Sequence, residues 1–148
     1  MSAGTSFDEI YELFLTQVDD YDLVQIEKEE RDEVLQGYLI SATKELFNYE
    51  ENDFTDFDLE SHQFNFELSG LEKQIMALGM KLTWTQLKKT SAELYQPAYG
   101  DRDFTVVQGT SYLKEINNQV VGLQSEIRRL IYQSEYNDPD HFGTMLNG

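Results

Sequence analysis

The stretch SYLKEINNQVVGLQSEIRRLIY, Ser111–Tyr132, decides the fold of this chain. Its apolar residues follow one another at alternating steps of three and four, which places them on one stripe of an α-helix. Most residues between them are polar or charged. The stretch therefore predicts a long amphipathic helix, opened by Thr110 or Ser111, whose stripe packs inside a single bundle or, as the alternative, forms a seam between subunits. Its buried stripe would consist of Leu113, Ile116, Val120, Leu123, Ile127 and Leu130.

Length and composition indicate one folded domain. The chain has 148 residues, and its nineteen aromatic side chains are too many for a disordered acidic tail. No run approaches the roughly 20 apolar residues of a membrane-spanning helix. The chain has no cysteine, which excludes disulfides and thiolate metal sites. We expect a helical domain over residues 1–136 and a flexible tail over 137–148.

The charge is strongly negative and unevenly placed. The net charge is −17, and residues 1–60 hold eighteen acidic and three basic side chains. Such a surface repels nucleic-acid phosphates, so direct binding to DNA or RNA is not expected. An acidic surface of this kind faces a basic protein partner, mimics DNA toward a DNA-binding protein, or simply keeps the protein in solution.

Three further helices are predicted upstream of the terminal one. Ser6 with Glu9, and Ser69 with Glu72, have the spacing of capping boxes, which begin helices. The expected helices span about 6–18, 27–48 and 70–90, the last extending as far as Leu94. In the second helix the expected buried stripe is Val34, Leu35, Tyr38, Leu39, Ala42 and Leu46. The third helix is apolar over a wide arc, so we expect it to be the central one.

Two connections carry most of the remaining apolar residues. Residues 49–67 have no helical period and mix phenylalanines with carboxylates, so a long acidic-aromatic loop is expected, with an extended piece at 63–67. Residues 103–107 contain a β-prone run and are expected to be extended. Both segments either fold onto their own bundle or dock partners by strand addition or by insertion into pockets. The fold class is all-α, with four main helices in a bundle.

Motifs for chemistry are weak in this sequence. No nucleophile elbow, phosphate loop or dinucleotide fingerprint occurs. His62 and His141 lie far apart, without a second histidine at helical spacing. We therefore expect no enzyme activity, no catalytic residue and no cofactor.

One partial metal pattern occurs in the acidic loop. Four carboxylates fall at positions 1, 3, 5 and 12 of a calcium-hand loop. However, Ser61 stands where the turn needs glycine, and Gln63 stands where an apolar residue is expected. We expect a solvated loop here and assign no metal ligand, although the sequence alone leaves cation binding open for Asp56, Asp58, Glu60 and Glu67.

Three segments resemble the small neck, or head–tail adaptor, proteins of tailed bacteriophages. They are TSFDEIYELFLTQV (5–18), YLISATKELF (38–47) and YGDRDFTVVQGTSYLKEINNQVVGLQSEIRRLIYQSEY (99–136). The resemblance implies a mostly helical virion protein, assembled in the host cytoplasm, that forms a ring beneath the portal protein, often of twelve copies. Such adaptors join the head to tail and neck proteins and carry no catalytic residues. The acidic insertion at 49–67 departs from the shortest members.

These observations lead to one main hypothesis and two alternatives. The main hypothesis is a head–tail adaptor that binds itself, the portal and tail or neck proteins, without a membrane or sequence-specific nucleic acid. The first alternative is an acidic DNA mimic that inhibits a host DNA-binding protein, and the second is a catalytic bundle with metal at Asp56 and its neighbours. The expected partner-binding residues are Phe54, Phe57, Phe64, Phe66, Phe104, Val106, Val107, Arg128 and Arg129.

Overall fold

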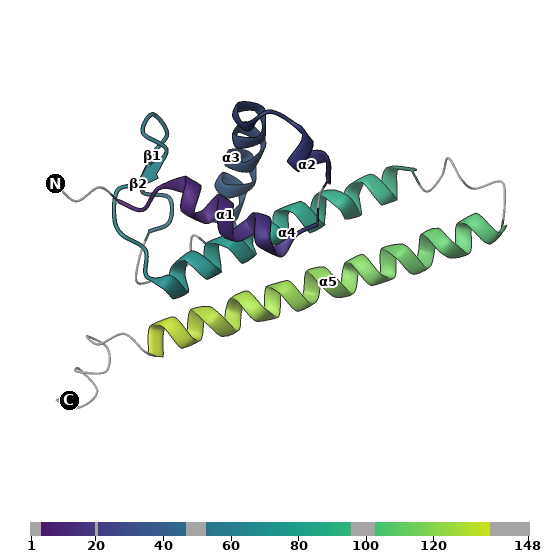
Figure 1. Ribbon diagram of the computed structural model, residues 1–148. Helices are drawn as coiled ribbons and strands as arrows, with labels where there is room; N and C mark the ends of the chain where they lie inside the picture. Colours follow the sequence, from purple (N-terminus) through teal and green to yellow (C-terminus); the bar gives the residue numbers. More distant parts are fainter. Residues whose placement is uncertain (1–3, 20, 47–52, 96–102, 137–148) are drawn as a thin grey trace.

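The computed structural model describes residues 4–19, 21–46, 53–95 and 103–136, and these form an all-α bundle (Figure 1). Two long helices, α4 (Gly70–Tyr95) and α5 (Asp103–Tyr136), run antiparallel along each other. In Figure 1, α1 (Phe7–Gln17) and α3 (Lys28–Glu45) lie on the side of α4 opposite to α5. The expected four main helices are therefore present, and the expected tail at 137–148 lies outside the described residues.

Two small elements complete the described chain. The five-residue helix α2 (Tyr21–Gln25) lies between α1 and α3, in a stretch that falls between two of the expected helices. Strands β1 (Phe57–Asp58) and β2 (Gln63–Phe64) form an antiparallel hairpin between α3 and α4, with Phe57 opposite Phe64. The expected extended piece at 63–67 thus pairs only over its first two residues.

Helix α4 is the central helix, as its wide apolar arc predicted. Ile75, Met76, Ala77 and Met80 are fully buried, and Leu82 is 2% exposed. α1, α3 and α5 all pack against this helix. Because a fully buried side chain of this size contributes about 1.5–3 kcal/mol relative to exposure, these positions supply much of the driving force for folding.

Helix α3 buries a narrower stripe than predicted. Leu35, Leu39, Ala42 and Leu46 are buried, whereas Tyr38 is half-buried. Val34 is 37% exposed, so its inclusion in the buried stripe was wrong. The four buried residues follow steps of four, three and four, which already fill the face that α3 turns toward α4. A residue one position before Leu35 is rotated by about 100° from that face.

Helix α5 confirms the stripe read from Ser111–Tyr132 from Ile116 onward, whereas Leu113 is only half-buried. Ile116, Val120, Ile127 and Leu130 are buried against the core, and Leu123 packs at its edge. The stripe therefore belongs to this chain's own bundle, as expected.

The extended segment expected at 103–107 is wrong, because α5 begins at Asp103. The β propensity of four residues is a weak preference that tertiary context overrides. Here the same segment continues a long helix that runs antiparallel to α4. The structure describes the backbone of this segment but not the side chains of Phe104, Val106 and Val107.

A glycine sets how closely α3 and α4 approach. A Cβ atom added at Gly79 would lie 2.9 Å from Cβ of Ala42 and 3.5 Å from Cδ1 of Leu46. Gly37, in α3, is different, because a Cβ added there meets nothing within 4 Å. Close packing of the two helices therefore occurs at Gly79 and not at Gly37.

These two glycines give a matched pair of substitutions. Gly37→Ala should raise the free energy of unfolding by about 1 kcal/mol, because alanine loses less backbone entropy in a helix. Gly79→Ala should lower it by about 1–2 kcal/mol, because two packed helix backbones would have to separate. Urea unfolding followed by circular dichroism measures both changes, and an equal gain at the two positions would contradict the close approach of α3 and α4.

Candidate functional site

Four of the predicted partner-binding residues form an aromatic cluster at the hairpin. Phe54 and Phe64 are fully buried in this chain's own core, and Phe57 and Phe66 are half-buried. The ring of Phe7, from the start of α1, meets those of Phe64 and Phe57 edge-on at centroid distances of 5.3 and 5.8 Å. Such edge-to-face pairs add to the gain from burial. The aromatic side chains therefore attach the loop to the bundle, and Phe54 and Phe64 offer no surface to a partner.

The N-terminal segment pairs with β2 through an isolated bridge, Ser6 opposite Gln63, and through neighbouring backbone hydrogen bonds. The amide of Phe64 donates to the carbonyl of Thr5 at 2.8 Å, and the amide of Thr5 donates to the carbonyl of Phe66 at 3.0 Å. The amide of Phe7 also donates to the carbonyl of His62 at 2.9 Å. One edge of β2 is thereby covered, so strand addition by a partner at that edge is blocked.

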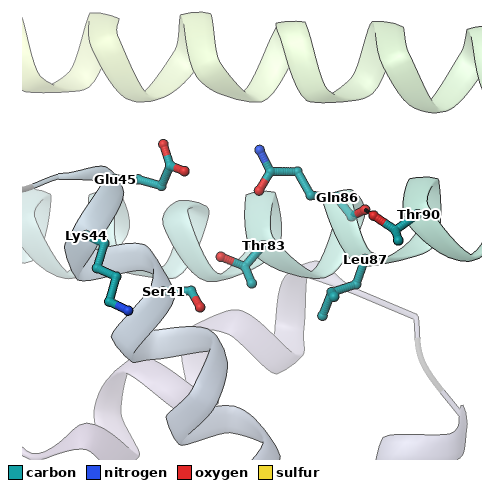
Figure 2. Close-up of a pocket in the computed structure, with 7 residues that line it drawn as sticks. All are labelled: Ser41, Lys44, Glu45, Thr83, Gln86, Leu87 and Thr90. Carbon is teal, nitrogen blue, oxygen red and sulfur yellow. Dashed lines mark hydrogen bonds between the residues drawn. The ribbon is translucent and has the colours of Figure 1, made fainter.

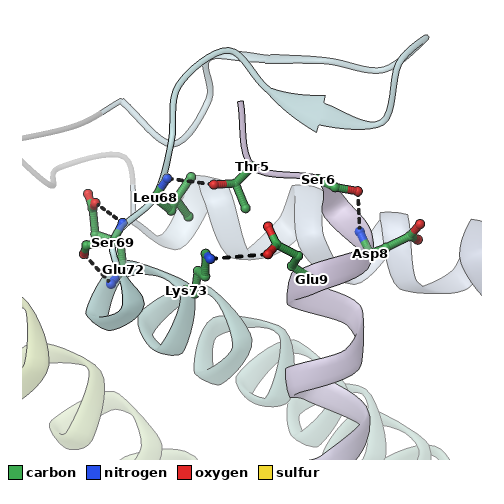
Figure 3. Close-up of polar contacts among 8 residues, drawn as sticks. All are labelled: Thr5, Ser6, Asp8, Glu9, Leu68, Ser69, Glu72 and Lys73. Carbon is green, nitrogen blue, oxygen red and sulfur yellow. Dashed lines mark hydrogen bonds and ion pairs between the residues drawn. The ribbon is translucent and has the colours of Figure 1, made fainter. Parts of the chain in front are cut away.

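The two capping boxes differ in the structure (Figure 3). At α4 the box is complete, since the Ser69 amide donates to Glu72 Oε1 at 2.9 Å and the Glu72 amide donates to Ser69 Oγ at 3.1 Å. At α1 only the serine caps, accepting from the amide of Asp8 at 3.2 Å. Glu9 instead reaches Lys73 of α4, with 3.4 Å between Oε1 and Nζ.

A buried hydroxyl fastens the start of the chain to the base of α4. Thr5 is 5% exposed, and its Oγ1 accepts a hydrogen bond from the amide of Leu68 at 2.8 Å (Figure 3). Thr5→Val should lower the free energy of unfolding by about 1–3 kcal/mol, because a buried N–H then has no acceptor. The exposed Thr16, whose hydroxyl donates to the Leu13 carbonyl, provides the control Thr16→Val. If thermal denaturation shows equally small losses of stability for Thr5→Val and Thr16→Val, the buried hydrogen bond between Thr5 and Leu68 is contradicted.

Tyr11 is a buried residue whose hydroxyl makes no hydrogen bond among the described residues. Its exposed fraction is 5%. Burial raises the pKa of Tyr11 well above its ordinary value, and the negative charges of Asp32 and Asp8 add to this effect. The folded protein therefore strongly favours the neutral phenol.

The raised pKa of Tyr11 predicts a pH effect. A raised pKa in the folded state contributes stability that is present below the unfolded pKa of about 10 and is lost as the pH rises beyond it. Tyr11→Phe should therefore unfold at the same urea concentration as the natural protein, or a higher one, near neutral pH. Between about pH 9 and about pH 11 the natural protein should lose more stability than the variant. If the natural protein and the variant lose the same stability over this pH range, the Tyr11 hydroxyl is exposed to water and the raised pKa is contradicted.

A shallow groove of about 290 Å³ lies between α3 and α4 (Figure 2). The hydroxyls of Thr83 and Thr90 donate back to carbonyls of their own helix, and the side chains of Lys44 and Glu45 point in different directions. Leu87, which is 49% exposed, is its main apolar group. The groove therefore offers no convergent set of groups for acid–base chemistry.

A larger cleft of about 570 Å³ lies where the end of α1 meets α4 and α5. Val18, Trp84 and Leu123 supply apolar surface, while Lys81 and Lys88 supply positive charge. The ammonium of Lys88 lies 3.8 Å from the centre of the Trp84 ring, which is a cation–π contact. This cleft could not be predicted from the sequence, because its residues come from the end of α1, from α4 and from α5 and share no sequence motif.

The outer face of α5 carries an exposed stripe. Val121 is 60% exposed and Tyr132 is 71% exposed, and the predicted contact residue Arg128 lies between them on the same side of the helix. We call Val121, Arg128 and Tyr132 the outer stripe. Arg129, also predicted as a contact residue, is held by Glu126, with 2.7 Å between Nη2 and Oε1.

The carboxylates of the calcium-like pattern do not assemble into a site. In the part of the chain that the structure describes, no group of three or more histidine or acidic side chains is placed to hold a metal ion. Asp56 accepts instead from Nδ2 of Asn65 at 2.8 Å, and Asp58 accepts from the amide of Glu60 at 3.0 Å.

Among the described residues, no helix is both long and apolar enough to cross a membrane.

Comparison of the chain with protein families, with curated proteins and with solved structures finds no match.

Proposed function

We propose that this protein is a structural adaptor that binds other proteins through its helical surfaces. We further propose that it forms a ring in the neck of a tailed bacteriophage, between the portal protein and tail components. The observation that carries the contact role is α5, a helix of 34 residues that buries one stripe in its own bundle and leaves its opposite face exposed. The resemblance of residues 5–18, 38–47 and 99–136 to phage neck proteins supplies the location.

The chemistry of the outer stripe supports a protein partner. Tyrosine and arginine are enriched at protein–protein interfaces, where each offers a large contact area together with hydrogen-bonding groups. In the outer stripe Tyr132 lies one turn from Arg128, and Val121 adds apolar surface two turns earlier. Single exposed apolar residues are common on protein surfaces, and here two of them share one helix face with Arg128.

The acidic surface suits a protein that surrounds a DNA channel. With a net charge of −17, each subunit repels phosphates, so a ring of subunits does not retain DNA in transit. The same surface also fits the alternative of a DNA mimic, which would place its carboxylates in the basic groove of a host protein. That alternative does not use the outer stripe, and this difference separates the two functions experimentally.

The mass of the purified protein, alone and with the portal protein, tests the proposal. We expect a stable multiple of the 17.2 kDa subunit, and a complex with portal. Replacing Val121 and Tyr132 by serine should weaken capture by portal about tenfold or more, because the apolar part of the contact is lost.

The control is Tyr112→Ser, which changes a tyrosine of 49% exposure outside the outer stripe and should leave capture unchanged. A monomer that ignores the portal would count against the adaptor. Salt-sensitive capture of a basic host protein, unaffected by changes in the outer stripe, would instead favour the DNA mimic.

A further inference from the structure

The turn of the β1–β2 hairpin presents an apolar side chain between two carboxylates. Leu59 is 45% exposed at the turn, and Asp58 and Glu60 flank it. We call these three residues the hairpin tip. Its shape is held by the Glu60 amide, which donates to Asp58 at 3.0 Å, and by His62, which adopts a positive φ of 55°. The tip is therefore an ordered projection rather than a loose loop.

The cleft between α1, α4 and α5 has complementary chemistry. Its apolar surface comes from Val18, Trp84 and Leu123, and among the described residues neither Lys81 nor Lys88 has a carboxylate partner. Asp19, which is exposed, is the only acidic residue in the described lining, so the positive charge exceeds the negative.

The distribution of charge favours a second copy of this chain as the occupant. Residues 1–69 hold nineteen acidic and three basic side chains, whereas residues 70–136 hold seven acidic and eight basic ones. Two copies of such a molecule repel each other if their acidic parts meet. They can approach when the acidic part of one copy meets the α4–α5 side of the other, where the cleft lies.

We propose that the hairpin tip of one copy inserts into the cleft of a neighbouring copy. Leu59 packs against the apolar surface, and Asp58 and Glu60 pair with Lys81 and Lys88. This proposal rests on the self-association proposed above and names the surfaces that make it. Because the two surfaces differ, the contact is head-to-tail, and repeated contacts of this kind close into a ring or extend into a filament.

A copy does not fill its own cleft. The hairpin packs at the start of α1, where the Phe7 amide meets the His62 carbonyl at 2.9 Å, whereas the cleft includes Gln17 to Asp19 at the other end of that helix. The 11 residues of α1 separate the two by about 16 Å. Figure 1 also shows the turn of the hairpin pointing away from α4.

Disulfide cross-linking tests the contact directly, because the chain has no cysteine of its own. Leu59→Cys and Gly122→Cys, which lies in the cleft lining, are prepared separately with tags of different size, mixed and oxidised. We expect a covalent heterodimer in the mixture at about ten times the yield of either variant alone. The control pairs Leu59→Cys with Leu87→Cys, an exposed residue in the groove between α3 and α4, and should give only background cross-linking.

A complementation experiment tests the head-to-tail geometry. Leu59→Lys disables the tip, and the double change Lys81→Glu with Lys88→Glu disables the cleft. Each variant alone should be monomeric, with its dissociation constant raised about tenfold or more. Their mixture should stop at heterodimers, because each variant retains one working surface.

The possible outcomes separate this contact from the proposed function. If the natural protein forms oligomers but the mixed Leu59→Cys and Gly122→Cys variants give only background cross-linking, the contact is overturned while self-association stands. If the natural protein stays monomeric at every concentration and the mixed variants do not cross-link, both proposals are overturned. Oligomers that persist in each variant alone would also contradict the contact.

Discussion

The burial of α4 is the constraint on which the rest of the structure depends. A helix that is apolar over a wide arc cannot face water, so other elements must cover it on several sides. α1 and α3 cover one side of α4, and α5 covers the other. Because Gly79 of α4 has no side chain, Ala42 of α3 can pack close against it. With α4 enclosed, the surfaces left open include the hairpin tip, the cleft where α1, α4 and α5 meet, and the outer stripe of α5. The contact role proposed for the protein uses those surfaces.

Helical periodicity made most of this arrangement predictable. The stripe from Ile116 to Leu130 and the wide apolar arc of α4 are local patterns, and each indicates burial. The complete capping box at Ser69 was also readable, because its two side chains lie within one turn. Features of this kind need only residues that are close in sequence.

The features that were missed depend on residues far apart in the chain. Phe104–Val107 reads as a strand locally, yet its backbone continues α5 along α4. The phenylalanines at 54–66 were equally consistent with burial and with partner binding, and only the position of Phe7 and the N-terminal segment shows that Phe54 and Phe64 are buried. The cleft with Lys81 and Lys88 could not be predicted, because Val18, Trp84 and Leu123 meet only in the folded bundle.

Charge connects the fold to the proposed assembly. The acidic side chains are concentrated in residues 1–69, while the α4–α5 hairpin is nearly neutral. A subunit with this polarity associates with itself most favourably through two unlike surfaces, since like surfaces would bring the most acidic regions together. An isologous dimer of the acidic faces is therefore the arrangement that the account excludes.

Hydrogen exchange measured on dilute and concentrated protein tests this central claim most directly. The account predicts that assembly slows exchange in two separate segments, the hairpin around Leu59 and the α4–α5 positions around Trp84 and Gly122. Slower exchange in only one of these segments, or in the acidic start of α3, would mean that copies meet through like surfaces. That result would contradict the account.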